Sequence, residues 1–408
     1  MLGVNGDYTM KWEMVNIPDV LFFQEGPGVR NTQFTKKGVK LLNVGNINYG
    51  NLNLNATNIY ISEEEAYGKY KHFLADDGDL IIASSGIVVD NFHNKISWVN
   101  KEHLPLCMNT STIRFKSLNP NILSLKFFSY FLKTHYFKNQ LSKLITGSAQ
   151  LNFGPSHLKQ IQIPLPPLTV QKEIAEILDT ADALRKKDNE LLKKYDELAQ
   201  SIFIEMFGDP VRNEKGWEVF SFESLFDSRL GKMLDVKKQI GKTKYKYLGN
   251  SNVQWFRLEL SNLAEMEFDQ KEIETLNLKD GDILICEGGD VGRCAIWKSE
   301  MDNVYFQKAI HRARPRKDNI LPSYLARLFW NFSKYGGFKD FVSTSTISHL
   351  TGEKLKTIPI PLPPIALQIK YDQIITNLNK QKNELTTITH TNNLFHSLLQ
   401  KAFKGELT

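Results

Sequence analysis

The chain has 408 residues, too long for one ordinary domain, and its length predicts two domains of about 150 residues each with connecting elements. Hydrophobic residues make up 41% and charged residues 24%, a balance that supports buried cores and excludes a largely disordered protein. The formal net charge of +6 favours an anionic partner such as nucleic acid, although this excess is modest for a DNA-binding protein.

Cysteine usage and the apolar runs indicate a cellular setting. Cys107, Cys286 and Cys294 form no CxxC pair, which excludes a disulfide framework and indicates a reducing compartment. No run approaches the roughly 18 apolar residues that a membrane span needs, and residues 1–18 lack the apolar core of a signal peptide. We therefore expect a soluble, cytoplasmic protein.

Short strands and helices alternate along both halves of the chain. Stretches rich in β-branched and aromatic residues predict strands at 41–47, 79–85 and 111–117, followed by a helix at about 122–145. The second half is predicted to contain strands and a helix in the same order, at residues 244–250, 282–288, 292–298 and 320–335. The glycine-rich stretch 287–292 is followed by a strand and not by a helix, so it predicts a hairpin turn and not a phosphate loop.

Each half ends in a long helical segment. Residues 170–207 contain no Gly or Pro, with Thr169 as a candidate N-cap and Gly208 as the stop. A second such segment follows residue 365 and stops at Gly405. Apolar residues recur at steps of three and four in both, which predicts the seam of a coiled coil. The expected seam residues are Ile174, Ile177, Leu184, Leu191, Leu198, Ile374, Leu378, Leu385, Ile388 and Phe395.

The chain is duplicated. The sequence Ile163-Pro164-Leu165-Pro166-Pro167 recurs 197 residues later, at residues 360–364. Upstream of it, Asp-Gly-Asp at residues 77–79 corresponds to residues 280–282, and Trp-Glu at residues 12–13 to residues 217–218. Two similar halves related by a pseudo-twofold axis would place the long helices antiparallel. The alternative is that each helix packs on its own lobe only.

The fold class is therefore α+β, with two similar globular domains joined by two long helices in an antiparallel coiled coil. The predicted boundaries are 1–167 for the first globular domain, 168–207 for the central helix, 208–364 for the second globular domain and 365–408 for the C-terminal helix. A helix of about 36 residues would be roughly 54 Å long.

These motifs carry a family resemblance. The segment IQIPLPPLTVQKEIAEILD, its copy TIPIPLPPIALQIKYDQI, the paired Asp-Gly-Asp strands and the FGDP after the first helix resemble the specificity subunit of type I restriction–modification systems. The resemblance covers essentially the whole chain. It implies that each globular half is a target-recognition domain for one part of a bipartite DNA site, and that the helices set the spacer and dock modification subunits.

The resemblance also implies the partners and cofactors. Expected partners are double-stranded DNA, two adenine-N6 methyltransferase subunits and motor-nuclease subunits. S-adenosylmethionine, ATP and magnesium would serve those partner subunits, and no cofactor is expected in this chain. The chain itself lacks the Asp/Asn-Pro-Pro-aromatic loop of amino-methyltransferases and any histidine–cysteine ligand spacing, so we expect neither catalysis nor a metal site.

DNA contacts are expected from basic, polar segments that match between the halves. The candidates in these segments are Arg30, Gln33, Lys36 and Lys37 in the first half and Arg229, Lys232, Lys237, Lys238, Lys242 and Lys244 in the second. A second set follows the Asp-Gly-Asp strands, where the halves diverge: Ser84, Ser85, Asp290 and Arg293.

One group of cations and two polar loops leave a choice of roles. Arg314 and Arg316, aligned with Arg114 and Lys116, could contact phosphates or be strand-edge charges. The polar loops 146–152 and 343–349 could contact DNA or cap helices. For the whole chain, a duplicated protein–protein scaffold without DNA readout is the alternative function.

Overall fold

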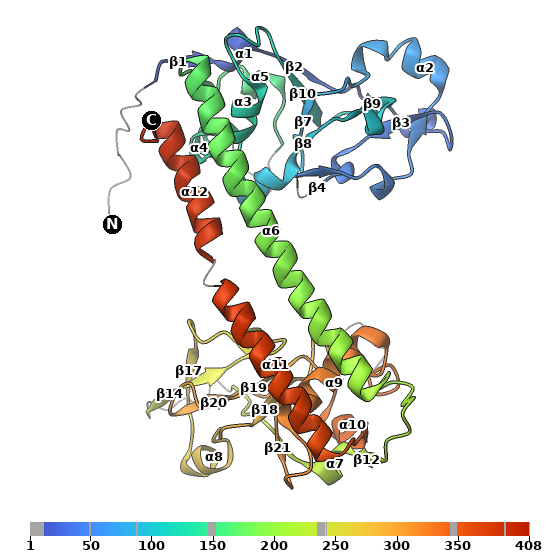
Figure 1. The fold of residues 1–408 in the computed structure, drawn as a ribbon, viewed down its shortest axis with the longest axis vertical. Helices are drawn as coiled ribbons and strands as arrows, with labels where there is room; N and C mark the ends of the chain where they lie inside the picture. The colour runs from blue at the N-terminus through green and yellow to red at the C-terminus, as the bar shows by residue number, and fades with distance from the viewer. Residues whose placement is uncertain are drawn as a thin grey trace. The chain divides into compact units, whose positions relative to one another are not determined.

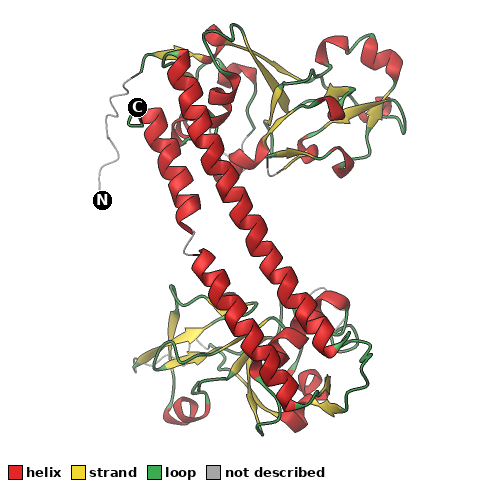
Figure 2. Cartoon of the chain, viewed as in Figure 1, coloured by secondary structure: helices red, strands yellow, loops and turns green. Residues whose placement is uncertain are grey.

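The structure is a computed structural model that describes residues 12–48, 50–86, 89–145, 152–234, 241, 243–342, 349–386 and 389–407. The chain divides into two compact units. Unit 1 comprises residues 1–189 and 387–408, and unit 2 comprises residues 190–386. Each unit therefore contains a lobe of strands and short helices together with parts of the long helices (Figures 1 and 2). In the described part of the chain, no helix is long and apolar enough to cross a membrane.

The lobe of unit 1 is built on two sheets. A four-stranded antiparallel sheet has the order β2-β10-β7-β8, and a three-stranded sheet has the order β6-β3-β9 with a parallel β3–β9 pair. Two short pairs, β1–β11 and β4–β5, complete the strands. The bounds are β1 Met14–Asn16, β2 Leu21–Glu25, β3 Val39–Leu42, β4 Ile47–Asn48, β5 Asn51–Leu52, β6 Tyr60–Ile61, β7 Leu80–Ala83, β8 Ile96–Trp98, β9 Leu106–Met108, β10 Thr112–Ser117 and β11 Gln162–Pro164.

The lobe of unit 2 repeats this topology strand for strand. Its sheets have the orders β13-β21-β18-β19 and β17-β14-β20, again with one parallel pair, and its short pairs are β12–β22 and β15–β16. The duplication expected from the sequence is therefore confirmed at the level of sheet order. The bounds are β12 Val219–Ser221, β13 Phe226–Leu230, β14 Lys244–Leu248, β15 Val253–Gln254, β16 Arg257–Leu258, β17 Ala264–Glu267, β18 Ile283–Cys286, β19 Cys294–Ile296, β20 Val304–Phe306, β21 Ile310–Pro315 and β22 Pro359–Pro361.

The repeated sequence motifs pair with one another. In unit 1 the Ile-Pro-Leu-Pro-Pro motif forms β11 and lies antiparallel to β1, which follows the Trp-Glu pair. The Leu165 N–H donates to the Glu13 carbonyl at 2.8 Å. In unit 2 the same motif forms β22 beside β12, and the Leu362 N–H donates to the Glu218 carbonyl at 2.9 Å. The two motifs recur together because each is half of one strand pair.

The Asp-Gly-Asp motif forms a tight turn before the central strands β7 and β18. Gly78 and Gly281 have φ of +85° and +81°, a conformation that favours glycine. The carboxylate of Asp79 accepts from the Asp76 N–H at 2.9 Å, and that of Asp282 accepts from the Lys279 N–H at 2.7 Å. These turns start the buried strands in both lobes. The predicted hairpin turn at 287–292 is also confirmed, because it joins β18 to its antiparallel neighbour β19.

The helix expected at 122–145 is two helices, α3 and α4. Thr134 breaks it by accepting from the Phe137 N–H at 3.2 Å, the contact of an N-cap. Its counterpart in unit 2, α9, is continuous. The bounds of the lobe helices are α1 Ile17–Val20, α2 Glu63–Tyr67, α3 Leu125–Phe131, α4 His135–Leu144, α5 Pro155–Leu158, α7 Phe222–Leu225, α8 Gln270–Thr275, α9 Pro322–Tyr335 and α10 Gly352–Thr357.

The first long helix, α6 (Leu168–Phe207), has 40 residues. It begins one residue before Thr169, so the prediction that Thr169 is its N-cap is wrong. The second long segment contains two described helices, α11 (Ile365–Thr386) and α12 (Thr389–Lys404); residues 387–388 between them lie outside the described residues. The structure groups each helix segment with the lobe on which it packs, whereas the predicted boundaries separate helices from lobes.

A fully buried glutamine anchors the first turn of each long helix. The Gln171 side chain accepts from the Ser124 N–H at 2.9 Å and donates to the carbonyls of Ile122 and Pro166, both at 2.8 Å. In unit 2 the Gln368 side chain makes the same three bonds, to the Leu321 N–H and to the carbonyls of Asn319 and Pro363. Each glutamine thereby ties its helix to the proline motif and to the loop that precedes α3 or α9.

In unit 1, α6 and α12 pack antiparallel against the lobe (Figure 1). Ile174 and Leu178 of α6 share one core with Phe395 and Phe403 of α12. The Phe403 ring stacks on Phe127 of α3 with 4.7 Å between centroids. The helix pair therefore completes the core of the first lobe.

In unit 2, the second part of α6 packs against α11. Tyr371 lies 5.6 Å from Phe203 and 5.3 Å from Phe207 between ring centroids, and further along α11 Lys382 pairs with Asp196 at 2.5 Å. Residues later in α11 contact residues earlier in α6, so the two segments are antiparallel here as well.

The expected coiled-coil seam is wrong at four positions of α6. Ile174, Leu378 and Phe395 are buried, Ile374 and Leu385 are half-buried, and Ile388 lies outside the described residues. In contrast, Ile177, Leu184, Leu191 and Leu198 are 39%, 47%, 37% and 48% exposed. Ile177 lies about 60° around the helix from Ile174, and residues seven apart rotate by a further ~20° per heptad. These four residues therefore form an exposed apolar stripe, which we call the α6 stripe.

The glutamine anchors yield a stability prediction. Replacing Gln171 with Leu leaves one buried N–H and two buried carbonyls without a partner, so we expect unit 1 to lose roughly 2–4 kcal/mol of unfolding free energy. Hydrogen exchange at the Ser124 amide should accelerate, as mass spectrometry of peptides covering residues 119–125 would detect. Gln160→Leu, at an exposed site, is the matched control and should change stability by less than about 0.5 kcal/mol. Equal stability of the two variants would contradict the anchoring role.

Candidate nucleic-acid interface

The basic segments predicted to contact DNA lie next to equivalent strands in the two lobes. In unit 1, residues 30–37 form a short 3-10 turn at Asn31–Gln33 and lead into β3. In unit 2, the segment runs from β13 to β14, and its residues Lys237, Lys238 and Lys242 lie outside the described residues. Because β3 and β14 occupy the same place in matching sheets, the alignment of these segments is correct.

In unit 1 the candidates divide into free cations and one structural side chain. Arg30, Lys36 and Lys37 are exposed, and among the described residues no carboxylate lies within ion-pair distance of them. Gln33 is different, because its amide donates to Glu65 and to the Tyr70 hydroxyl at 3.0 Å. Gln33 therefore ties the turn to α2, while the three cations are available to phosphates.

In unit 2 the same division applies. Lys232 is half-buried, pairs with Glu272 and lies 5.3 Å from the Phe268 ring, so it holds the segment that follows β13 against α8. Arg229 is exposed on β13. Lys244 is exposed on β14 but lies opposite Glu267 of β17 in the strand register, which reduces the positive field there.

Sequence reasoning missed Lys246. This residue is exposed on the same face of β14 as Lys244, with Glu265 as its cross-strand partner. The alternation Lys-Tyr-Lys-Tyr at residues 244–247 is the signal that could have found it, because every second residue of a strand points to the same face.

The turns that follow β7 and β18 are more constrained than expected. Ser84 is 1% exposed and its hydroxyl has no partner, while Ser85 is half-buried. In unit 2, Asp290 accepts from the Trp255 indole N–H at 2.5 Å and from Ser333 at 3.1 Å. Arg293 donates to the Asn250 carbonyl at 2.8 Å. Asp290 and Arg293 therefore shape the turn, and their side chains are already occupied by these contacts.

The structure does bring each turn together with the end of the polar loop that leads to the long helix. The Phe153 N–H donates to the Ser84 carbonyl at 2.9 Å, and the Leu350 N–H donates to the Glu287 carbonyl at 2.7 Å. Asn152 and His349 are the described residues of the two polar loops; residues 146–151 and 343–348 lie outside the described residues. Asn152 accepts from the Gly86 N–H at 3.0 Å. One surface in each lobe thus combines two segments predicted separately.

A neutral histidine lies below the turn of unit 2. His311 on β21 is 2% exposed, and burial lowers its pKa to about 4, so the imidazole is uncharged at pH 7. Its Nε2 atom is 3.9 Å from the Glu287 carboxylate. The interior of this turn therefore adds no positive charge to the surface.

The cations of β10 and β21 are structural, and their predicted alignment is shifted by two residues. Phe115 lies opposite Leu80, and Ala313 lies opposite Ile283, so the strand register pairs Arg114 with Arg312 and Lys116 with Arg314. Lys116 and Arg314 pair with the buried Asp79 and Asp282 of the Asp-Gly-Asp turns. Arg316 donates to the Glu223 carbonyl at 2.9 Å. These contacts favour the strand-edge interpretation over phosphate binding.

The described residues contain no group of three or more His, Cys, Asp or Glu side chains that could hold a metal ion. The described surface is therefore suited to recognition. It offers exposed guanidinium and ammonium groups that can contact phosphates, and polar turns whose composition differs between the two lobes.

A family model described as type I restriction modification DNA specificity domain matches the chain twice, over residues 10–194 and 214–394. The specificity subunit of the type I restriction enzyme EcoKI from Escherichia coli is 27% identical over 69% of this chain. That of MjaVIII from Methanocaldococcus jannaschii is 29% identical over 46% of this chain. The matched parts span 65% and 44% of these two relatives, less than two thirds of their lengths.

Solved structures share the fold. An S subunit of a type I restriction–modification system from M. genitalium matches with a TM-score of 0.54 at 16% identity, covering 98% of each chain. A chain from a study of complex assembly and conformational transition of the type I R-M system matches with a TM-score of 0.55 at 16% identity. It covers 98% of this chain and is itself covered completely. Both structural matches extend over unit 1 and unit 2.

The free cations of unit 1 yield a binding prediction. Replacing both Lys36 and Lys37 with Gln should lower the affinity for duplex DNA and reduce the slope of log affinity against log salt by about 2, because each lost phosphate contact contributes roughly 0.9. The measurement is the affinity for duplex DNA, followed by fluorescence anisotropy between 50 and 200 mM salt. Over this range the affinity of the parent chain should fall about tenfold or more.

The control is a Lys101→Gln, Lys159→Gln double variant, which removes the same charge from exposed sites outside both candidate segments. If the two double variants had equal slopes, Lys36 and Lys37 would not contact phosphates.

Proposed function

Because this chain belongs to the family of type I restriction–modification DNA specificity domains, we propose that it is the DNA sequence-specificity subunit of a type I restriction–modification complex. The observation that carries the proposal is the double match of the family model, once over each half of the chain. The matching strand orders of the two lobes support it, since two equivalent lobes suit a DNA site in two parts.

Each lobe, in this proposal, is a target-recognition domain that reads one half of a bipartite site. Framework residues agree between the lobes, as the glutamine anchors and the Asp-Gly-Asp turns illustrate. The turns after β7 and β18 differ in sequence and length, Ser-Ser-Gly in one and a glycine-rich hairpin in the other. Different turns on a common framework are what reading two different sequences requires.

The chain is non-catalytic in this proposal. The relatives are named as specificity subunits. We propose that methyl transfer and DNA cleavage fall to separate modification and restriction subunits. S-adenosylmethionine, ATP and magnesium serve those partners. In support, the sequence has no Asp/Asn-Pro-Pro-aromatic loop to hold a flipped base.

Two modification subunits dock on the long helices, and the α6 stripe is the surface that we assign to one of them. Ile177, Leu184, Leu191 and Leu198 are large apolar side chains left 37% to 48% exposed along a single helix. Large apolar side chains left exposed in a row on one helix are typical of a protein-binding surface. Its heptad spacing suits a partner helix that packs with coiled-coil geometry.

The long helices also set the spacer between the two half-sites. α6 is continuous over 40 residues, which corresponds to about 60 Å at 1.5 Å per residue. Such a length exceeds one helical turn of DNA, about 34 Å, and agrees with a run of unread base pairs between two specific blocks.

The decisive test of the function is a map of methylated adenines in host DNA with and without the gene for this chain. Loss of one bipartite motif is the expected result. An unchanged methylation map would overturn the proposal, provided that the modification subunits are expressed in both strains.

The spacer proposal yields its own prediction. Inserting seven helix-forming residues between Asn189 and Glu190, and seven more at residues 387–388, should lengthen the unread run by about 3 base pairs, because seven residues add ~10.5 Å. The readout is the methylated motif. An insertion of the same length at residues 213–215, in the turn after α6, should leave the spacer unchanged. A spacer of unchanged length in the helix variant would contradict the proposal.

The docking proposal predicts a loss of assembly without a loss of fold. Replacing Leu184 and Leu191 with Glu should reduce the amount of modification subunit co-purified with this chain at least tenfold, since charges replace apolar contacts. Lys193→Glu is the control on the same helix, because this exposed residue lies about 160–180° around the helix from Leu184 and Leu191 and its reversal changes the net charge by the same two units. Circular dichroism and thermal unfolding should match those of the parent chain. Retained assembly in the Leu variant would rule out the α6 stripe as the dock.

The alternative, a duplicated protein–protein scaffold, differs in its response to salt. A DNA reader loses affinity for DNA steeply as salt rises, whereas a scaffold shows no retention on DNA at any salt concentration. Arg30, Lys36 and Lys37, which are exposed and have no ion-pair partner within the described residues, favour the DNA reader.

A further inference from the structure

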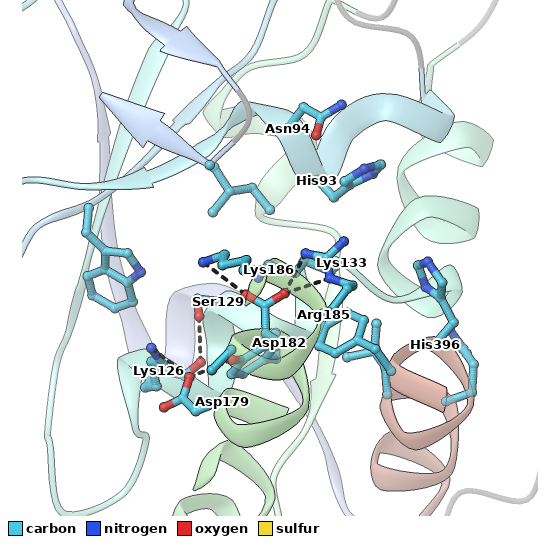
Figure 3. A pocket seen from close by; sticks show the side chains of 18 of the residues that line it. His93, Asn94, Lys126, Ser129, Lys133, Asp179, Asp182, Arg185, Lys186 and His396 are labelled. Atoms are coloured by element: carbon cyan, nitrogen blue, oxygen red, sulfur yellow. Dashed lines mark hydrogen bonds and ion pairs between the residues drawn. The ribbon is translucent and has the colours of Figure 1, made fainter. Parts of the chain in front are cut away.

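A cavity of about 640 Å³ lies within unit 1 between the lobe and its helix pair (Figure 3). Its walls come from α3, α4, the first part of α6, α12 and the 3-10 segment Val89–Lys95. This volume is within the range of small-molecule sites, about 300–1,000 Å³. None of the DNA-contact candidates discussed above lines it.

The walls of this cavity carry an excess of positive charge. Five cationic side chains line it, against the two carboxylates of Asp179 and Asp182, so the balance of these seven groups is +3. Three histidines line it as well. The five cations are Lys126, Lys133, Lys138, Arg185 and Lys186.

Both carboxylates are already engaged by neighbours in the wall (Figure 3). Asp182 accepts from the Arg185 guanidinium, with 3.0 Å to its Nε, and pairs with Lys186 at 3.2 Å. Asp179 accepts from the Tyr130 hydroxyl at 2.5 Å and pairs with Lys126 at 2.9 Å. The acids therefore hold part of the wall together, and the charged groups that line the cavity keep a positive balance.

Lys133 is the cation that this internal pairing does not explain. Among the described residues no carboxylate lies within ion-pair distance of its ammonium group, which lies 4.6 Å from the centroid of the Tyr130 ring. Burial lowers the pKa of Lys133 to about 8; Asp182 raises this pKa, and Lys186, Arg185 and Lys126 lower it further. On the opposite wall, burial together with Arg185, Lys138 and His135 lowers the pKa of His396. Burial is the largest cause of both pKa shifts, and neighbouring cations act in the same direction on both groups.

We propose that this cavity binds the phosphate group of a nucleotide-sized ligand, with Lys133, Arg185 and Lys186 around the phosphate. A phosphate monoester carries close to two negative charges and three acceptor oxygens, which suits several converging N–H donors and an excess of three charges. The half-buried Trp98 of β8 also lines the cavity and offers a flat apolar surface for a base. The phosphate comes either from a free nucleotide or from a DNA backbone. This inference concerns unit 1 only and does not depend on the proposed function.

A purely structural role for the cations that line the cavity explains fewer of them than phosphate binding does. Arg185 and Lys186 would hold the helix through Asp182, and Lys126 would do so through Asp179. Lys133 would then be a half-buried cation with no ion pair among the described residues and only the longer-range attraction of Asp182 to offset the cost of its burial. A bound anion removes that cost.

The test is calorimetric titration of the full-length chain with ATP, ADP, AMP and adenosine. We expect affinity to fall in that order, with adenosine at least tenfold weaker than ATP. Lys133→Gln should weaken ATP binding at least tenfold. Lys187→Gln, the matched control at an exposed neighbouring position of α6 that does not line the cavity, should leave it unchanged.

A competition arm identifies the source of the phosphate. Displacement of ATP by a short DNA duplex at low salt would assign the cavity to a backbone phosphate, and retention of ATP would assign it to a free nucleotide. A second readout requires no variant: ATP should raise the pKa of His396 followed by NMR. The proposal is overturned if neither ATP nor inorganic pyrophosphate binds, or if Lys187→Gln weakens binding as much as Lys133→Gln does.

Discussion

The buried amide of one glutamine in each half determines where the long helix leaves its lobe. Gln171 and Gln368 are both fully buried, and each makes three hydrogen bonds to the main chain around the start of its helix. A planar amide with one acceptor and two donors satisfies all three groups only in one orientation. The first turn of the helix is thereby fixed to the proline motif and to the loop before the next helix. The core contacts of α6 and α11 follow from that fixed starting point.

Features encoded by neighbouring residues could be predicted from the sequence. The duplication, the central strands and the hairpin after β18 rest on local pattern and on glycine at positive φ, and the structure contains them. The helix seam could not be predicted in the same way. Heptad spacing identifies an apolar stripe on α6, but the contacts with the lobe determine which side of the helix is buried. The lobe covers Ile174 and Leu178 and leaves Leu184 and Leu191 exposed.

The candidate interface illustrates the same limit for polar residues. Gln33 and Lys232 have the chemistry of DNA contacts, yet Gln33 bonds to Glu65 and Tyr70, and Lys232 pairs with Glu272, partners more than 30 positions away in the chain. No pattern within a segment reveals such a partner. The exposed cations Arg30, Lys36 and Lys37 remain candidates because no carboxylate in the described part of the chain pairs with them. The cationic cavity was also invisible in the sequence, because its walls come from segments scattered between residues 50 and 400.

The place of α12 in the core of unit 1 has a consequence for how the protein is synthesised. Phe395 and Phe403 fill that core beside Phe127 and Phe131, although all of residues 190–386 lie between them in the chain. At about 5–20 residues per second, a ribosome needs roughly 10–40 s to make that intervening stretch. During this interval the nascent first lobe exposes the aromatic face that α12 later covers. Chaperones, or the α12 segment of another copy, can reach this face before the chain's own helix exists, so domain exchange between copies competes with correct folding.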